Sequence, residues 1–284
     1  MLGSLFMYCY KNAKIQNAIA LQDRAFHYGD GCFTTAKVVD GQVQLWHRHL
    51  KRLEKACVQL QLQCDLSGLE TTLRQIFSEN QFQHGSLKIV ISRGEGQRGY
   101  AFPDHPADIW IFCYPSKPIE GNSLSWIDNV EFLDSRIGIT MPTLVGIKTL
   151  NRLEQVMLKQ EALTKQLAEA LVVDIEGRIV EGISSNCFMH VNNRWITPDL
   201  GYNGVHGIMR EEILSRMQQL HIKCDKAPIT IAQSSQIDAL FFCNALHPMQ
   251  IVKHFNGRAL AIEPAQQLYK QLKLNQIDAL WLNQ

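Results

Sequence analysis

The sequence predicts an α+β protein of two domains, a smaller N-terminal α/β domain and a larger C-terminal domain. Three observations support this fold class. The 284 residues are enough for two modest domains, each with its own core. Segments with strand and helix periodicity alternate along the first part of the chain. A stretch rich in proline, glycine and serine, YPSKPIEGNS, then interrupts them. We therefore expect an N-terminal domain over 1–114, a linker over 115–122 and a C-terminal domain over 123–284.

The predicted N-terminal domain contains a hairpin, a helix and two strands. Residues 34–46 favour a hairpin, because Asp40-Gly41 suits a turn with positive φ. Residues 47–61 carry apolar side chains at three- and four-residue spacing, which predicts an amphipathic helix. Residues 87–92 alternate apolar and polar side chains as a half-buried strand does, and the apolar run over 108–114 is typical of a central strand.

The predicted C-terminal domain again mixes helices with strands. A first helix is expected within 148–166, where an apolar stripe comprises Leu150, Leu153, Val156 and Met157. Two strands are expected around a Glu-Gly turn in 170–182. The remaining expected elements are a helix from Ile208 to about Leu220, a buried strand over 239–243 and a closing helix from Pro264.

Composition excludes several classes of function. The formal net charge of +1 gives no field that would attract nucleic acid or an anionic membrane. The sequence has no apolar stretch of the roughly 20 residues that a membrane-spanning helix needs, and its start lacks a basic leader with a cleavage site. We therefore expect a cytoplasmic protein.

The eight cysteines are expected to be free thiols, because none forms a C-x-x-C pair and several lie inside apolar runs. His47 and His49 have no cysteine or histidine neighbours at the spacing of zinc sites, so no metal is expected.

A glycine-rich motif at residues 94–99 fits the pattern G-x-G-x-x-G after a predicted strand. A dinucleotide site also requires a helix to begin there, with its N-terminus facing the pyrophosphate. The following residues, YAFPDHPAD, contain two prolines where that helix would run. We interpret the segment as a mobile loop that presents Arg98.

Three charged residues are ambiguous when each is taken alone. Lys148 follows an apolar stretch, and a lysine desolvated there would have a lowered pKa and could act as a neutral amine. Most lysines in such positions are nevertheless solvated surface residues. Glu181 follows the strand GRIV, and Arg52 lies off the apolar stripe of its helix. Only their combination is informative.

Taken together, the motifs resemble those of the fold-type IV pyridoxal-phosphate enzymes. Lys148 is followed by Glu181 in E-G-I-S-S-N-C-F and then by V-H-G-I-M-R, which ends at Arg210. Upstream stand Asp23-Arg24, the segment Gly29-Asp30-Gly31, and His49-x-x-Arg52-Leu53. These separated matches occur in the family's order and cover nearly the whole chain.

The resemblance implies a pyridoxal 5′-phosphate site between the two domains. Lys148 would anchor the cofactor and act as the catalytic residue, and Glu181 would keep the pyridine nitrogen protonated. Arg52 would bind the phosphate through two hydrogen bonds from its planar guanidinium. The phosphate would also meet the backbone N–H groups of Ile208 and Met209 at a helix N-terminus, and residues Asn244 and Ala245.

Three segments resemble the lyase branch of this class, which converts 4-amino-4-deoxychorismate to 4-aminobenzoate and pyruvate for folate synthesis. They are GDGCFTTAKVVDG, GIKTLNRLEQV and FFCNALHPM. The implied partner is a small dicarboxylate substrate, for which Arg98, Tyr100 and Phe33 are the candidate contacts. Arg152 is either a further contact to the substrate or a partner of Glu154.

Two alternatives stay open. One is a branched-chain or D-amino-acid aminotransferase on the same scaffold, although D-amino-acid transaminases carry tyrosine at the position of Phe33 and histidine at that of Tyr100. The other is a catalytically inactive binding protein, against which the joint presence of Lys148, Glu181 and Arg52 argues. The resemblance further implies a homodimer with the site near the dimer interface.

Overall fold

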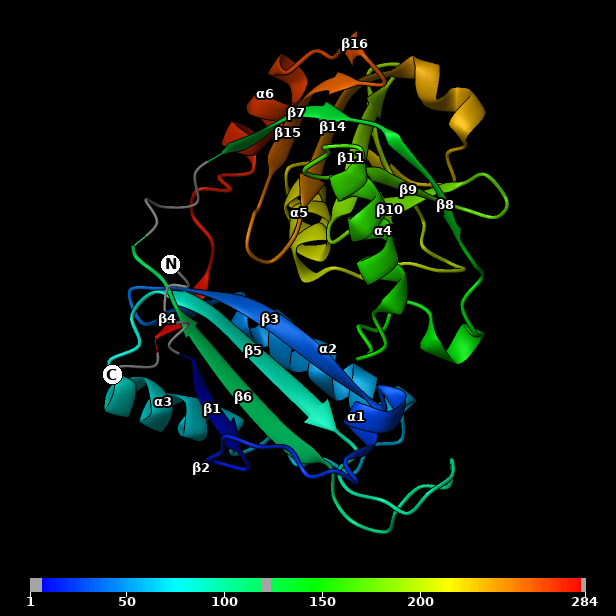
Figure 1. The fold of residues 1–284 in the computed structure, drawn as a ribbon. Coiled ribbons are helices and arrows are strands. Elements are labelled where there is room, and N and C mark those ends of the chain that lie inside the picture. The colour runs from blue at the N-terminus through cyan, green and yellow to red at the C-terminus, as the bar shows by residue number, and fades with distance from the viewer. Residues whose placement is uncertain (1–6, 119–123, 282–284) are drawn as a thin grey trace. The chain divides into compact units, whose positions relative to one another are not determined.

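A computed structural model describes residues 7–118 and 124–281 of the protein (Figure 1). The chain divides into two compact units. Unit 1 comprises Met1–Glu120, Ile147–Asn151 and Ile277–Gln284, and unit 2 comprises Gly121–Gly146 and Arg152–Gln276. Two short segments from later in the chain thus belong with the N-terminal part. The predicted domain limits do not include this interleaving, and they stay a prediction.

Unit 1 is built on one sheet with the strand order β17-β4-β3-β5-β6-β1-β2. Its neighbouring strands pair antiparallel. Asp40 and Gly41 join β3 to β4 with φ of 51° and 70°, which confirms the predicted turn. The strands are β1 (Tyr8–Lys11), β2 (Lys14–Ile15), β3 (Gly31–Val39), β4 (Gln42–Gln44), β5 (Gly85–Ser92), β6 (Asp108–Pro115) and β17 (Ala279–Trp281).

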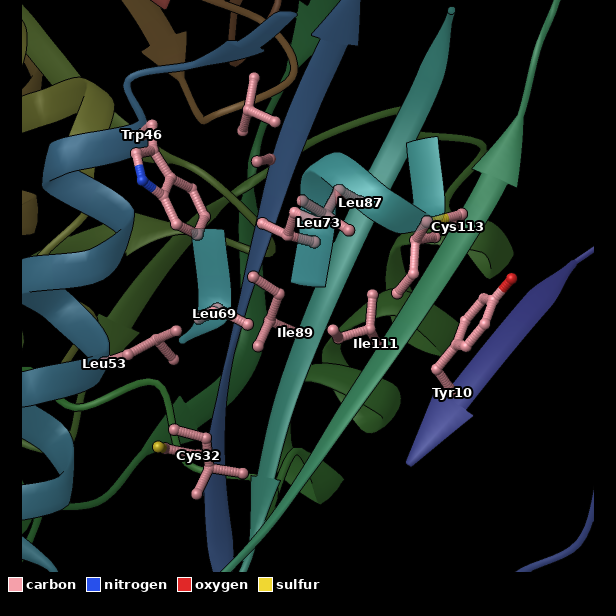
Figure 2. Packing of buried hydrophobic residues seen from close by; sticks show 14 of the residues in the cluster. Tyr10, Cys32, Trp46, Leu53, Leu69, Leu73, Leu87, Ile89, Ile111 and Cys113 are labelled. Carbon is pink, nitrogen blue, oxygen red and sulfur yellow. The ribbon is translucent and has the colours of Figure 1, made fainter. Parts of the chain in front are cut away.

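Helices α2 (Trp46–Gln59) and α3 (Leu69–Asn80) supply the apolar side chains that cover one face of this sheet, and α1 (Arg24–Tyr28) is a short helix before β3. Figure 2 shows Leu53 of α2 and Leu73 of α3 packed with Ile89 and Ile111 of the sheet. These four side chains are at most 1% exposed. Burial of such a face is the main stabilising contribution to a sheet and its helices.

Unit 2 contains two sheets. The smaller has the order β10-β9-β8, and the larger has the order β13-β12-β11-β14-β15-β16 with β7 paired to β15. The strands are β7 (Ser125–Val130), β8 (Phe132–Ile137), β9 (Leu171–Asp174), β10 (Ile179–Gly182), β11 (Asn186–Val191), β12 (Arg194–Thr197), β13 (Cys224–Lys226), β14 (Ile237–Cys243), β15 (Gln250–Phe255) and β16 (Arg258–Ala259).

The described part of unit 2 also contains three α-helices and two short 3₁₀ helices. The α-helices are α4 (Leu153–Thr164), α5 (Ile208–Gln219) and α6 (Glu263–Gln271), and the 3₁₀ helices are η1 (Pro142–Leu144) and η2 (Ile231–Gln236). Leu158 and Ala162 of α4 are buried against Leu133, Val172 and other residues of the smaller sheet. Together with unit 1, this arrangement confirms the α+β class that the sequence predicts.

The helix predicted within 148–166 differs from the observed one in its start and its buried face. It begins at Leu153, because residues 148–150 are extended and pair with the start of β3. Leu153, Val156 and Met157 of the predicted stripe are at least 60% exposed within the structure. Spacing alone therefore identified the helix but not the side that unit 2 buries.

Within the described ranges 7–118 and 124–281, no helix combines the length and apolarity that crossing a bilayer requires. All eight cysteines lie in these ranges and are free thiols, five of them buried.

Candidate active site

The residues that the sequence assigns to the site are divided between the two units. Unit 1 holds Phe33, Arg52, Arg98, Tyr100 and Lys148, and unit 2 holds Glu181, Ile208, Met209, Asn244 and Ala245. Each group is described within its own unit.

Lys148 is held by the start of β3. The backbone N–H of Phe33 donates to the carbonyl of Lys148 at 3.0 Å, and the N–H of Leu150 donates to the carbonyl of Gly31 at 3.0 Å. The side chain of Lys148 is half-buried, and its Nζ lies 4.8 Å from the centre of the Phe33 ring. A lysine on an extended, paired segment has a fixed backbone, which favours a defined position for its amine.

Lys88 of β5 is a second amine at the same ring, and it was not among the residues that the sequence indicated. Its Nζ lies 4.9 Å from the centre of the Phe33 ring, and burial lowers the pKa of Lys88. Thr35 stands opposite Lys88 in the ladder between β3 and β5. The sequence signal that could have identified Lys88 was its position on the polar face of a strand with alternating apolar and polar residues.

Arg52 lies on α2 three residues after His49, so both side chains leave the helix on one side. Its Nη2 donates to the hydroxyl of Thr34 on β3, and that hydroxyl lies 2.6 Å from Nδ1 of His49. Burial, and next the charge of Arg52, hold the pKa of His49 well below its usual value. His49 is consequently neutral at physiological pH.

Arg98 and Tyr100 lie in the loop between β5 and β6, and both are exposed. The buried Arg24 holds this loop, since its Nη1 donates to the carbonyl of Gly99 at 2.9 Å and its Nε to Asp30 at 2.8 Å. No helix follows the motif at residues 94–99 in this described loop, so the element that a dinucleotide site requires is missing.

Glu181 lies on β10 and is only 7% exposed. One carboxylate oxygen, Oε2, accepts a hydrogen bond from the side chain of Asn186 at 3.1 Å and another from the backbone N–H of Val205 at 3.0 Å. Asn186 also donates to the carbonyl of Val205 at 3.0 Å. A buried carboxylate with two fixed donors is held in one orientation.

Arg152 lies beside Glu181 within unit 2. Burial lowers the pKa of Arg152, and the negative charges of Glu181 and Glu154 oppose that change. The charge of Glu154 thus acts on Arg152, which agrees with a pairing of the two side chains, and the contact of Arg152 with the substrate stays a prediction.

Ile208 and Met209 form the first turn of α5, and both side chains are buried. The preceding Gly207 is the N-cap and makes no side-chain cap hydrogen bond. A Cβ at position 207 would lie 1.9 Å from Oδ1 of Asn186. The glycine thus lets Asn186 pack directly against the backbone at a helix N-terminus, where N–H groups and the helix dipole favour an anion.

Asn244 and Ala245 form a tight turn after β14. The side-chain oxygen of Asn244 accepts from the N–H groups of Leu246 and His247, each at 2.9 Å. Its amide donates to the carbonyl of Ser184 at 3.4 Å, so this turn contacts the one that links Glu181 to Asn186.

The donor set fits pyridoxal phosphate. An arginine and a helix N-terminus suit a phosphate, a buried carboxylate suits a protonated pyridine nitrogen, and a half-buried lysine suits an aldehyde. The described residues contain no group of three histidine, cysteine or acidic side chains arranged to hold a metal ion.

A groove of about 810 Å³ lies beside α2 in unit 1, and none of the predicted site residues lines it. Its walls include Trp46, Leu50 and Phe102, with acidic side chains at Glu54 and Glu70.

The chain matches the family model described as "Amino-transferase class IV" over residues 31–255. It is 32% identical over 242 residues to a protein of Vibrio harveyi named aminodeoxychorismate lyase, and the match covers 83% of this chain and 86% of that protein. It is 22% identical over 246 residues to a D-alanine aminotransferase of Bacillus licheniformis, which covers 86% and 85% of the two chains.

Among solved structures, the chain resembles a 4-amino-4-deoxychorismate lyase from Pseudomonas aeruginosa. The TM-score is 0.84 at 29% identity, and the match covers 93% of this chain and 98% of that one. Lyases and aminotransferases thus both occur among the similar proteins.

Proposed function

Because the chain belongs to the class IV aminotransferase family, we propose that it is a pyridoxal-phosphate-dependent lyase that converts 4-amino-4-deoxychorismate to 4-aminobenzoate and pyruvate. One observation carries this proposal: proteins named as that lyase match more than four fifths of the chain, one by sequence and one by structure.

The proposed site uses residues of both units. Lys148 anchors the cofactor, and Arg52 together with the N–H groups of Ile208 and Met209 binds its phosphate. The turn at Asn244 and Ala245 completes the phosphate contacts. The fixed carboxylate of Glu181 supports a role in holding a proton on the pyridine nitrogen.

Bound pyridoxal phosphate would supply an electron sink for the substrate carbon that bears nitrogen. The amine of Lys148 would be the base that removes the proton from that carbon. Once the C–O bond on the neighbouring carbon breaks, the same amine would return a proton to the departing three-carbon fragment, giving pyruvate. General acid–base help of this kind is typically worth about 10²–10⁴-fold in rate.

Cationic side chains of unit 1 bind the two substrate carboxylates in this proposal. Arg98 is the contact indicated by the sequence. Lys88 is added because its amine lies at the Phe33 ring, as that of Lys148 does. Tyr100 and Phe33 contact the apolar part of the substrate.

The decisive experiment is a 4-aminobenzoate assay with purified holoenzyme and aminodeoxychorismate, without any keto acid. We expect product under these conditions. Product that forms only after addition of 2-oxoglutarate and an amino donor would establish the aminotransferase alternative, which the D-alanine aminotransferase match keeps relevant.

Lys148→Ala provides the matched test of the anchor. The wild-type protein should carry an absorption band near 410–430 nm, a range implied by the family resemblance, and borohydride should remove it. The variant should lack both this band and the activity. A variant that retains the borohydride-sensitive band would place the anchor at another lysine.

We propose in addition that the protein is cytoplasmic, as its composition predicts, and that it forms a homodimer, as the family resemblance implies. Light scattering of the purified protein tests the assembly. A mass of one chain, 32.4 kDa, would contradict it.

A further inference from the structure

Three hydrogen-bonded side chains, the half-buried Arg52 and the buried Thr34 and His49, link α2 to β3 within unit 1. Thr34 is 0% exposed and His49 is 1% exposed. The hydroxyl of Thr34 contacts both partners, Nη2 of Arg52 and Nδ1 of His49. Thr34 faces the helices, as do its neighbours Cys32 and Ala36 in the buried core of the sheet.

One direction of hydrogen-bond donation, from Arg52 to Thr34 and from Thr34 to His49, satisfies the contacts of all three side chains. A guanidinium donates and never accepts, so the oxygen of Thr34 must accept from Arg52. The buried hydroxyl proton then needs an acceptor of its own, and the lone pair on Nδ1 of His49 supplies it at 2.6 Å. In this arrangement His49 is neutral, with its proton on Nε2. Burial, and next the positive charge of Arg52, lower the pKa of His49 and favour this neutral form.

We propose that Thr34 and His49 are positioning residues that hold the guanidinium of Arg52 in the orientation that binds the cofactor's phosphate. The inference rests on the proposed function, because it assigns the phosphate to Arg52. Thr34 and His49 do not touch the cofactor in this account. They act only through Arg52.

The physical gain is pre-organisation. A free arginine side chain loses rotamer entropy when it is fixed on a ligand. The hydroxyl of Thr34 fixes Arg52 before the phosphate arrives, so binding does not include that loss. The orientation of the hydroxyl is in turn set by His49, which is itself immobilised by burial.

The test compares two ligands that differ only in the phosphate, pyridoxal phosphate and pyridoxal. Thr34→Val and His49→Leu should each weaken pyridoxal phosphate binding to the apoprotein about 10-fold or more, the cost of a hydrogen bond to a charged group. The affinity for pyridoxal should change less than 2-fold, which corresponds to less than about 0.4 kcal/mol. Equal weakening of both ligands would mean general damage to unit 1 and would overturn the proposal.

Conservative variants supply the rescue. Thr34→Ser keeps the hydroxyl, and His49→Asn places an amide oxygen near the position of Nδ1. Both should restore most of the preference for the phosphorylated ligand. His47→Leu and Thr71→Val change the same residue types at exposed positions on α2 and α3, and both should leave binding unchanged.

Arg52→Ala separates failure of the inference from failure of the proposed function. If wild-type protein binds both ligands equally and Arg52→Ala changes nothing, then Arg52 is not the phosphate ligand and the proposed site is wrong. If Arg52→Ala selectively weakens pyridoxal phosphate while Thr34→Val and His49→Leu do not, only the positioning role fails. If Arg52 binds the phosphate and Thr34 positions Arg52, adding Thr34→Val to Arg52→Ala should not weaken pyridoxal phosphate binding further.

Discussion

At the scale of single residues, the buried polar groups are the most informative. Glu181, Thr34 and His49 are all nearly inaccessible, and each has a partner that fixes its orientation. Burying such groups costs free energy unless every hydrogen bond is made. Their occurrence together with Lys148 and Arg52 therefore favours a functional site over incidental polar packing.

Glu181→Gln should preserve the fold and reduce activity. The amide oxygen of glutamine can accept both hydrogen bonds that Oε2 accepts, but a neutral amide does not stabilise a protonated pyridine nitrogen. We expect kcat to fall about 10²-fold, the scale for loss of one preorganised electrostatic contact. Glu176→Gln, at the exposed turn between β9 and β10, is the control and should retain wild-type kcat. A Glu181→Gln enzyme with the kcat of the wild type would show that Glu181 has no role in the mechanism.

His105 should make the loop that carries Arg98 sensitive to pH. Its Nδ1 and Nε2 lie 2.8 and 2.7 Å from the carbonyls of Pro106 and Glu95, and only a protonated ring can donate to both. These carbonyls, and then the charges of Asp108 and Glu95, raise the pKa of His105, whereas slight burial opposes the shift. Lys11 partly offsets Asp108 through an ion pair at 2.9 Å.

A raised folded-state pKa means that this stabilisation is complete below the unfolded value of about 6.5 and is lost as pH rises through the folded value. Trypsin cleavage after Arg98, normalised to a peptide substrate at each pH, should therefore be faster at about pH 8.5 than at about pH 6. His105→Gln should abolish the difference. A rate ratio independent of pH in the wild type would contradict the role of the imidazolium.

At the scale of elements, periodicity identified most helices and strands but not what their surfaces contact. The helix over 47–61 was predicted closely because one side of it packs on a single sheet. The helix after Lys148 was placed too early, because residues 148–150 pair with β3, a contact between segments more than 100 residues apart. Strand β17 was missed for the same reason.

The N-terminus of α5 offers an element-scale test, because Gly207 and Gly68 are both N-cap residues of 12-residue helices. Alanine at position 207 would meet the buried Asn186 at 1.9 Å, whereas at position 68 nothing lies within 4 Å. Both changes share the N-cap loss of up to about 1 kcal/mol. Gly207→Ala should cost about 1–3 kcal/mol more in the free energy of unfolding, the usual range for overpacking. Equal losses in urea unfolding would refute the close packing.

At the scale of the whole molecule, the sequence led to the fold class and to a family because separated motifs occurred in a fixed order. It did not reveal Lys88 or the contact of Thr34 with Arg52, since both depend on the register of β3 against β5 and α2. The interleaving of the two units is likewise a property of the folded chain.

Truncation after Gln276 should destabilise unit 1. It removes β17, whose pairing covers the edge of β4, and the hydrogen bond from the N–H of Leu45 to the carbonyl of Asp278 at 2.8 Å. Each backbone hydrogen bond lost costs about 1 kcal/mol, and a bare strand edge promotes aggregation. Thermal unfolding and light scattering should both reveal the loss. Truncation after Trp281 is the control, and identical behaviour of the two proteins would contradict the contribution of β17.

The position of β17 also has a consequence for biosynthesis. The other strands of the first sheet are translated before unit 2, yet β17, the strand that covers the β4 edge, is translated after it. In the nascent protein this strand border is therefore unpaired for as long as unit 2 is being synthesised. A chaperone that shields strand borders would be most useful during this interval, and a product interrupted before β17 would expose a border that promotes aggregation.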